Sequence, residues 1–263
     1  MTLGYALVFV LIGHILADFY AQTDRIAREK RGSVRFLALH CGLYALCLIP
    51  FCLLSFSFPR AVGAWVVLAL VHAAIDAAKM AWERRKKASL AVFCFDQALH
   101  VLACLVVSSA FFDGFSVVDV AIPLVGVMGR ESFSVGLSAA LVLLVVWRPA
   151  AIFVRLLLGS LRMGCAVPDE PTEPAEPRES TATAEEPRTG TWIGILERTI
   201  IGVLTLCGQF EAIAFVLTAK SIARFKRLSD DKGFAECYLV GTLASTAIAI
   251  LASLVAQGVV GWS

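Results

Sequence analysis

Four histidines and three aspartates in strongly apolar stretches are the side chains of this chain best suited to chemistry. Three of the histidines have an aspartate four residues away, and these pairs are His14 with Asp18, His72 with Asp76, and His100 with Asp96. The fourth histidine, His40, has no such aspartate. On a helix, side chains four residues apart lie on one face, about one turn from each other. Imidazoles and carboxylates are ligands of divalent zinc, manganese and iron. The pattern therefore predicts a divalent metal site, with zinc or manganese favoured over iron.

The elements that must position these residues are membrane-spanning helices. The chain has 263 residues, of which 59% are hydrophobic and 17% charged, with a mean hydropathy of +0.79. This composition excludes an ordinary soluble globular domain, a disordered chain and a nucleic-acid binder. A helix needs about 20 apolar residues to cross a bilayer. Such runs are found at 2–22, 35–57, 62–81, 89–112, 134–158, 192–219 and 236–261, with a shorter run at 116–129. We expect an all-α, polytopic membrane bundle of about seven or eight transmembrane helices.

Lysine and arginine are concentrated in three short loops, 23–35, 82–88 and 220–232. Because such loops stay on the cytoplasmic side, the N-terminus is predicted to lie outside. The chain must then cross an even number of times between 82–88 and 220–232, yet three clear runs lie there. Either 116–129 is a short or re-entrant span, or one of the other runs does not cross. The Arg148-Pro149 pair would allow a span to end there and an interfacial helix to begin.

The same topology predicts the depth of the seven residues. Counted from the basic loops, a shallow layer lies roughly five to eight residues into the membrane, and a second layer lies one turn, about 6 Å, deeper. The shallow layer contains Asp18, His40, Asp76 and Asp96, and the deep layer contains His14, His72 and His100. We expect the deep layer to hold one metal and the shallow layer to hold or bridge a second.

Composition divides the chain into four parts. Residues 1–113 are predicted to form a four-helix membrane bundle with the His/Asp site, and 114–162 an additional membrane hairpin or span. Residues 163–190 are rich in proline, glutamate and threonine, and we expect a disordered acidic linker. Residues 191–263 are predicted to form a C-terminal pair of membrane helices.

Other polar residues are expected at the same depth. Lys79 continues the face of the His72–Asp76 pair and would stabilise negative charge on a substrate. Glu211 lies in the apolar run before Lys220 and is a candidate ligand or general base, or else a partner of a nearby Lys or Arg. Tyr44, one turn beyond His40, would orient that ring, whereas Gln97 is expected to point away from Asp96.

Four motifs carry a resemblance to a known family. They read, in order, GHILADFYAQTDRIAREK, LALHCGLY, VHAAIDAAK and FDQALH. Together they resemble the bacterial membrane family called domain of unknown function 3307, over roughly residues 6–110. The segment ILERTIIGVLTLCGQFEAIAFVLTAKSIARF is similar to the C-terminal part of many members. The resemblance implies that the motif positions are His14, Asp18, Gln22, Lys30, His40, Tyr44, His72, Asp76, Lys79, Asp96, Gln97 and His100, but it implies no activity.

Three functions are compatible with this pattern. The leading interpretation is a membrane-embedded, metal-dependent hydrolase that opens to the cytoplasmic face and acts on a small phosphorylated compound or a lipid headgroup. The second is a divalent-cation or proton transporter that uses the same residues, and the third is a scaffold in which the His–Asp pairs only connect helices. The expected partners are membrane lipids and the substrate, with no nucleic acid. The chain has no Gly-rich phosphate loop, no G-x-S-x-G and no H-E-x-x-H.

Overall fold

The structure is a computed structural model that describes residues 3–83, 89–114, 129–161 and 186–261. All regular elements among these residues are helices. They are α1 (Leu3–Ile15), η1 (Leu16–Tyr20), α2 (Asp24–Glu29), α3 (Val34–Ser55), α4 (Phe58–Glu83), α5 (Leu90–Phe111), α7 (Arg130–Trp147), α8 (Pro149–Ser160), α9 (Glu186–Leu206), α10 (Phe210–Ala223), α11 (Phe225–Asp230) and α12 (Lys232–Val260).

Six described segments are long and apolar enough to cross a membrane. They are Leu3–Tyr20, Val34–Ser55, Phe58–Glu83, Leu90–Phe111, Glu131–Ser160 and Lys232–Val260. The all-α class and the membrane assignment are therefore confirmed. The count of seven or eight spans stays a prediction, because the short run at 116–129 lies almost wholly outside the described residues. The expected linker lies outside them up to residue 185, and the division into domains also stays a prediction.

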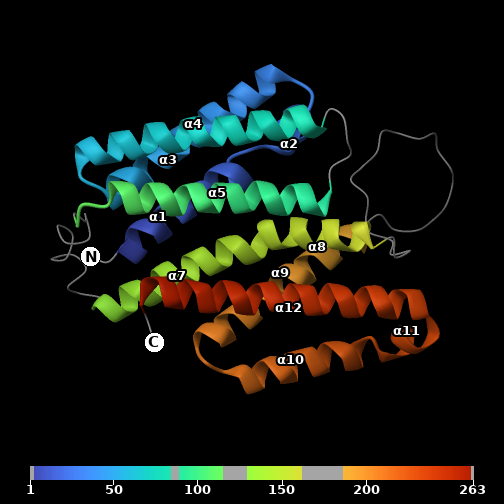
Figure 1. Cartoon of the computed structure of the whole chain (residues 1–263). Helices are drawn as coiled ribbons and strands as arrows, with labels where there is room; N and C mark the ends of the chain where they lie inside the picture. The colour runs from blue at the N-terminus through green and yellow to red at the C-terminus, as the bar shows by residue number, and fades with distance from the viewer. Residues whose placement is uncertain (1–2, 84–88, 115–128, 162–185, 262–263) are drawn as a thin grey trace.

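The apolar run 192–219 is not the single helix that we expected. The chain turns back after Leu206, and α9 and α10 lie beside each other as a hairpin (Figure 1). Gly208 has a φ of 70°, and Gln209 N–H donates to Leu204 O at 2.8 Å, which is the Schellman ending of a helix. Hydropathy did not reveal this turn because both arms of the hairpin are apolar.

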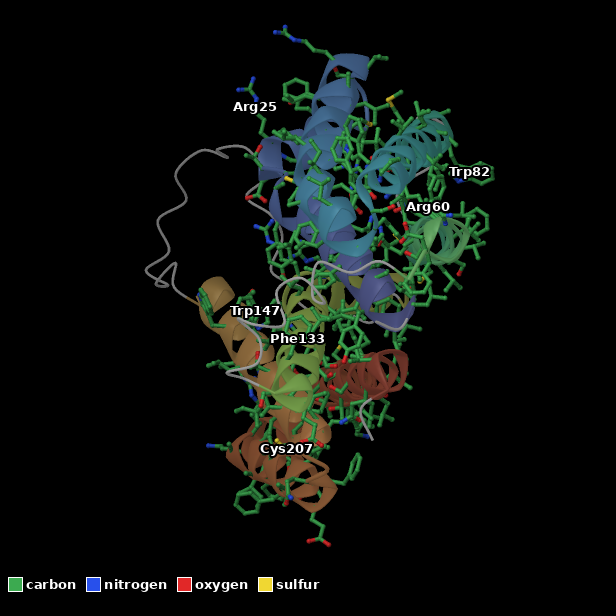
Figure 2. The ribbon with its side chains drawn as sticks, turned by 90° about the vertical axis from the view of Figure 1, so that its left-hand side faces the viewer. Arg25, Arg60, Trp82, Phe133, Trp147 and Cys207 are labelled. Atoms are coloured by element: carbon green, nitrogen blue, oxygen red, sulfur yellow. The ribbon has the colours of Figure 1, made fainter. Side chains whose placement is uncertain are left out.

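Two groups of helices pack against each other along α1 (Figure 1). The first group is α1, α3, α4 and α5, and the second contains α7, α9 and α12, with α1 in contact with α7 and α12 as well. Phe133 of α7 lies between the groups (Figure 2), with its ring centroid 6.0 Å from that of Tyr5 and 6.4 Å from that of Phe9. Within the first group, a Cβ added at Gly13 would lie 2.7 Å from the Phe51 ring. Only glycine therefore permits this approach of α1 to α3.

The junction between α7 and α8 fixes the end of η1. Arg148, between the two helices, donates from Nη1 to Phe19 O at 2.6 Å, and its guanidinium lies 5.6 Å from the centre of the Tyr20 ring. The Tyr20 hydroxyl donates to Leu144 O at 2.8 Å. Arg148, which the sequence linked only to a helix end, thus connects the second group of helices to the segment that carries Asp18.

Candidate metal centre

The four histidines and three aspartates are all buried and lie together among α1, η1, α3, α4 and α5. We call these seven residues the His/Asp cluster: His14, Asp18, His40, His72, Asp76, Asp96 and His100, each at most 5% exposed. They come from segments far apart in the chain, so the cluster exists only in the folded bundle. The His–Asp spacing of four explains why α4 and α5 each contribute a pair from one face.

Asp18 reaches the cluster from an irregular turn of helix. After Ile15 the α1 helix continues as the π-helical turn η1, closed by a hydrogen bond from Ala21 N–H to Leu16 O at 2.8 Å. A π-turn changes the direction of the side chains that follow, and such turns are frequent at functional sites. The carboxylate of Asp18 lies 3.3 Å from His40 Nε2 and accepts a hydrogen bond from Gln97 Nε2 at 3.1 Å.

His40 Nε2 is the centre of the most compact group of ligand atoms. It lies 3.2 Å from His72 Nε2, 3.2 Å from Asp76 Oδ2 and 3.3 Å from Asp18 Oδ1. His72 Nε2 lies 3.9 Å from Asp76 Oδ2. The four residues each offer one ligand atom, and these atoms all lie within 4.8 Å of one another.

The three separations from His40 Nε2 are close to the edges of a metal-coordination tetrahedron, whereas the separation between His72 Nε2 and Asp76 Oδ2 is longer. Zinc–nitrogen and zinc–oxygen bonds of about 2.0–2.2 Å give edges of roughly 3.3–3.6 Å between ligand atoms. Three of the distances from His40 Nε2 are within about 0.1 Å of that range. The buried group formed by Asp18, His40, His72 and Asp76 can therefore hold a metal ion.

A second group with ligand geometry shares Asp76 and adds Asp96 and His100. His100 Nδ1 lies 2.9 Å from the carbonyl oxygen of Asp96, which can only accept a hydrogen bond, so Nδ1 carries the proton. In the neutral ring this leaves a lone pair on His100 Nε2, which is buried and has no protein hydrogen-bond partner among the described residues. A backbone carbonyl that fixes the tautomer in this way is typical of metal-ligating histidines.

The three deep imidazoles lie against one another, and the rings of His14 and His100 are stacked. The centroid of the His72 ring lies 4.6 Å from that of His100, and the His14 ring lies 5.1 Å from His100 and 6.2 Å from His72. His14 belongs to neither group with ligand geometry. The structure thus divides the candidate ligands differently from the expected layers, because His72 joins the carboxylates and His14 lies behind them.

Tyr44 contacts the deep histidines rather than His40, which we expected it to orient. Its ring is parallel to that of His72 with centroids 3.5 Å apart, and its hydroxyl lies 3.2 Å from His14 Nδ1. Tyr44 is 1% exposed, so it fixes both rings from the apolar side of the bundle.

Two lysines and one amide complete the polar network. Lys30 Nζ lies 3.1 Å from Asp76 Oδ2 and 3.8 Å from Asp18 Oδ1, and Lys79 Nζ lies 2.7 Å from Asp96 Oδ2. Gln97 donates to both Asp18 and Asp96 at 3.1 Å. The expectation that Gln97 points elsewhere is therefore wrong.

Sequence reasoning missed the contacts of Lys30 and Gln97. Lys30 was one of several loop cations, and nothing in its local spacing shows that α2 folds back over the cluster. The only signal for either residue was its position on a family motif.

A polar cavity of about 140 Å³ gives access to the cluster from one end of the bundle. Its charged lining residues are Asp18, Lys30, Arg31, Asp76, Lys79 and Glu83. Toward the other end the cluster is closed by buried apolar residues that include Leu48, Leu68 and Cys104. Among the described residues, the cluster is thus open to one side.

Glu211 is not part of this centre. It is exposed in the first turn of α10, and α10 packs against α9 rather than against the helices of the cluster. Figure 1 shows α10 on the far side of α12 from α3, α4 and α5. The expected role of Glu211 assumed one continuous span over 192–219, and the turn at Gly208 removes that assumption.

One comparison with known proteins gives a match. The family model described as Protein of unknown function (DUF3307) matches residues 6–125. The resemblance to this family is confirmed. The matched region contains all seven residues of the His/Asp cluster together with Lys30, Lys79 and Gln97. No curated protein and no solved structure matches the chain.

Proposed function

We propose that this protein is a membrane-embedded, metal-dependent hydrolase whose substrate carries a phosphoester, either in a small compound or in a lipid headgroup. The observation that carries the proposal is the group of four buried ligand atoms that includes His40 Nε2, all within 4.8 Å of one another and beside a polar cavity. Zinc and manganese are the favoured ions, because the donors are imidazole nitrogen and carboxylate oxygen.

The charges of the cluster support a bound cation. Three buried carboxylates face two lysines, Lys30 and Lys79, so that one negative charge lacks a counter-charge. An uncompensated carboxylate inside a membrane protein costs several kcal/mol. A protonated His40 would also balance this charge, but its single Nε2 proton can be donated to only one of the three atoms that face it. A divalent ion would neutralise the charge and leave the centre attractive to an anion.

Unpaired buried atoms point in the same direction. His100 Nε2 and Asp96 Oδ1, which belong to the second group with ligand geometry, have no protein hydrogen-bond partner among the described residues. Each unsatisfied buried polar atom costs about 1–3 kcal/mol. A network built only to connect helices would be expected to pair these atoms, so the arrangement favours a ligand site over a scaffold.

The chemistry follows from the cavity and its cations. A zinc ion held by these residues would lower the pKa of its bound water to about 7 and so would provide a nucleophile at neutral pH. The oxygen of the water would form a bond to phosphorus, the ester P–O bond would break, and the leaving oxygen would take up a proton. Lys30 and Lys79, which line the cavity, would stabilise the negative charge on the phosphoryl oxygens.

The direction of the cavity favours hydrolysis over transport. A transporter needs access to its site from both sides of the membrane, whereas apolar side chains close the cluster toward the end opposite the cavity. We place the open end on the cytoplasmic side of a bacterial inner membrane, with the N-terminus outside, because α2 and α11, both adjacent to basic loops, lie at this end (Figure 1).

The α9–α10 hairpin supports this orientation. It returns the chain to the end of the bundle at which α9 begins, so an even number of crossings would separate the basic loops at 82–88 and 220–232. The parity conflict in the sequence does not then arise. In this orientation Arg148 and Arg155, at the start of α8 and within it, would also lie in the cytoplasmic half, as the positive-inside rule predicts.

The test is hydrolysis of bis(p-nitrophenyl) phosphate by detergent-purified protein, with zinc or manganese and after chelation. We expect turnover that needs metal and is lost in His72→Ala, with Ser253→Ala, a buried polar change in α12, as the control. Absence of turnover, together with metal flux into proteoliposomes that disappears in Asp76→Asn, would overturn the proposal in favour of transport. Absence of both activities, with cluster variants that affect only stability, would favour the scaffold.

A further inference from the structure

A large apolar groove lies on the surface of the bundle between α4 and α5. Its volume is about 590 Å³, within the range of about 300–1,000 Å³ that is usual for ligand sites. Ala74, Ala78 and Trp82 of α4 and Ala91, Phe95 and Leu99 of α5 line it. The alanines leave the space open, and Figure 2 shows Trp82 projecting outward from the bundle.

Lys79 and Asp96 are the charged residues of this groove. Lys79 also lines the polar cavity, and its Nζ lies 2.7 Å from Asp96 Oδ2. The ion pair therefore lies where the groove meets the cavity. A groove that served only to pack against another apolar surface would not need a lysine and a carboxylate of the His/Asp cluster in its lining.

We propose that this groove holds an acyl chain of an anionic membrane phospholipid, whose headgroup reaches the His/Asp cluster over Lys79. The inference rests on the proposed function and selects a lipid rather than a soluble phosphoester as substrate. Because α4 and α5 are both membrane-spanning segments, their outer faces border the hydrocarbon, and the lipid would enter sideways from the bilayer.

Charge complementarity favours an anionic headgroup. The Lys79 ammonium has three N–H donors, and its hydrogen bond to Asp96 uses one, so that among the described residues two can reach phosphate oxygens. Lys30 and Arg31, further along the cavity, offer additional cations to the same headgroup. The rival occupant is a helix of a second copy of the chain. It would pack on Ala74 and Ala78, because small residues four positions apart allow two helices to approach closely. It would cover the junction with the cavity and leave Lys79 without a role.

The fluorescence of Trp82 provides a direct test. A variant that retains Trp82 and has phenylalanine at the other four tryptophan positions is reconstituted in phosphatidylcholine vesicles. Quenching is measured as brominated phosphatidylglycerol or brominated phosphatidylcholine replaces the host lipid. We expect phosphatidylglycerol to bind about fivefold more strongly, the factor expected for one lysine near an anionic lipid.

Matched variants separate groove binding from ordinary contact with lipid. Ala78→Phe fills the groove and should remove the preference, whereas Ala77→Phe places the same ring at an exposed neighbouring position outside the groove and should retain it. Lys79→Met should abolish the headgroup preference but leave quenching by the chains. Equal quenching by both lipids, or an unchanged lipid preference in Ala78→Phe, would overturn the inference. Shielding of Trp82 from both lipids in a dimer would also overturn it.

The measurement requires neither metal nor turnover, so the two proposals fail separately. Lipid preference in a protein that binds no metal would remove the hydrolase and retain the lipid site. Hydrolysis of the soluble phosphoester without lipid preference would remove only the lipid site.

Discussion

Replacement of Lys30 by methionine should destabilise the metal-free protein strongly and the metal-bound protein much less. Lys30 Nζ lies 3.1 Å and 3.8 Å from carboxylate oxygens of Asp76 and Asp18. At an effective dielectric constant of about 20, these distances correspond to gross attractions of about 5 and 4 kcal/mol, much of which desolvation offsets. Removing one partner of a buried ion pair typically costs about 3–5 kcal/mol. We expect a loss of this size in the presence of a chelator.

A bound divalent ion changes that result because it would compensate the same two carboxylates. The difference between the two losses equals, by linkage, the change in the free energy of metal binding. A loss smaller by about 1.4 kcal/mol with zinc corresponds to zinc binding about tenfold tighter in Lys30→Met than in the wild type. Lys30 and the metal would thus compete for the same oxygens.

The assay is thermal unfolding in detergent with chelator and with zinc, combined with zinc affinity from competition with a fluorescent chelator. Arg31→Met is the matched control. Arg31 also lines the cavity, but its side chain is 61% exposed and its contact with Glu83 is 3.7 Å long, so we expect a change of at most about 1 kcal/mol. Equal destabilisation of Lys30→Met with and without zinc, and an unchanged zinc affinity, would refute the reasoning.

Three further predictions concern packing, the polar network and the excluded residue. Gly13→Ala should lower the free energy of unfolding by about 1–3 kcal/mol, because its Cβ would lie 2.7 Å from the Phe51 ring. Gly42→Ala is the control and should not destabilise the protein, because no atom lies within 4 Å of the added Cβ. Chemical denaturation measures both variants. Gln97→Leu should keep the fold but reduce zinc affinity or turnover about 10–100-fold, since it removes hydrogen bonds to two aspartates of the cluster, and an unchanged affinity and rate would contradict this. Glu211→Gln should change neither zinc content nor hydrolysis, because Glu211 is exposed on α10, and loss of either would return it to the site.

The sequence predicted those parts of the site that depend on helical periodicity. A spacing of four placed His72 with Asp76 and Asp96 with His100 on single faces, and the basic loops placed the pairs at matching depths. Both inferences need only a regular helix and the position of its end. The structure brings these side chains together for the same reason.

Features that depend on tertiary contact could not be predicted in this way. The π-turn at Asp18 has no glycine or proline to mark it, and its last residues are fixed by contacts with Arg148 and Leu144, more than a hundred residues away. The contact of Lys30 with Asp76 likewise depends on how α2 folds back over the cluster. Local spacing contains no information on either.

The α9–α10 turn was missed for a different reason. Hydropathy averaged over a window of residues cannot separate one long span from two apolar arms joined by a tight turn. The signal was local, in Gly208 followed by Gln209 within an apolar run. Reading that pair as a helix end would also have excluded Glu211 from the site.

Metal content is the most direct test of the central claim, that the His/Asp cluster is a metal site. The measurement is elemental analysis of protein purified in detergent without added chelator, for the wild type and for His40→Ala and His72→Ala. We predict about one or more equivalents of zinc or manganese per chain in the wild type, and a large loss in both variants. Less than about one tenth of an equivalent in the wild type, with no change in the variants, would contradict the account.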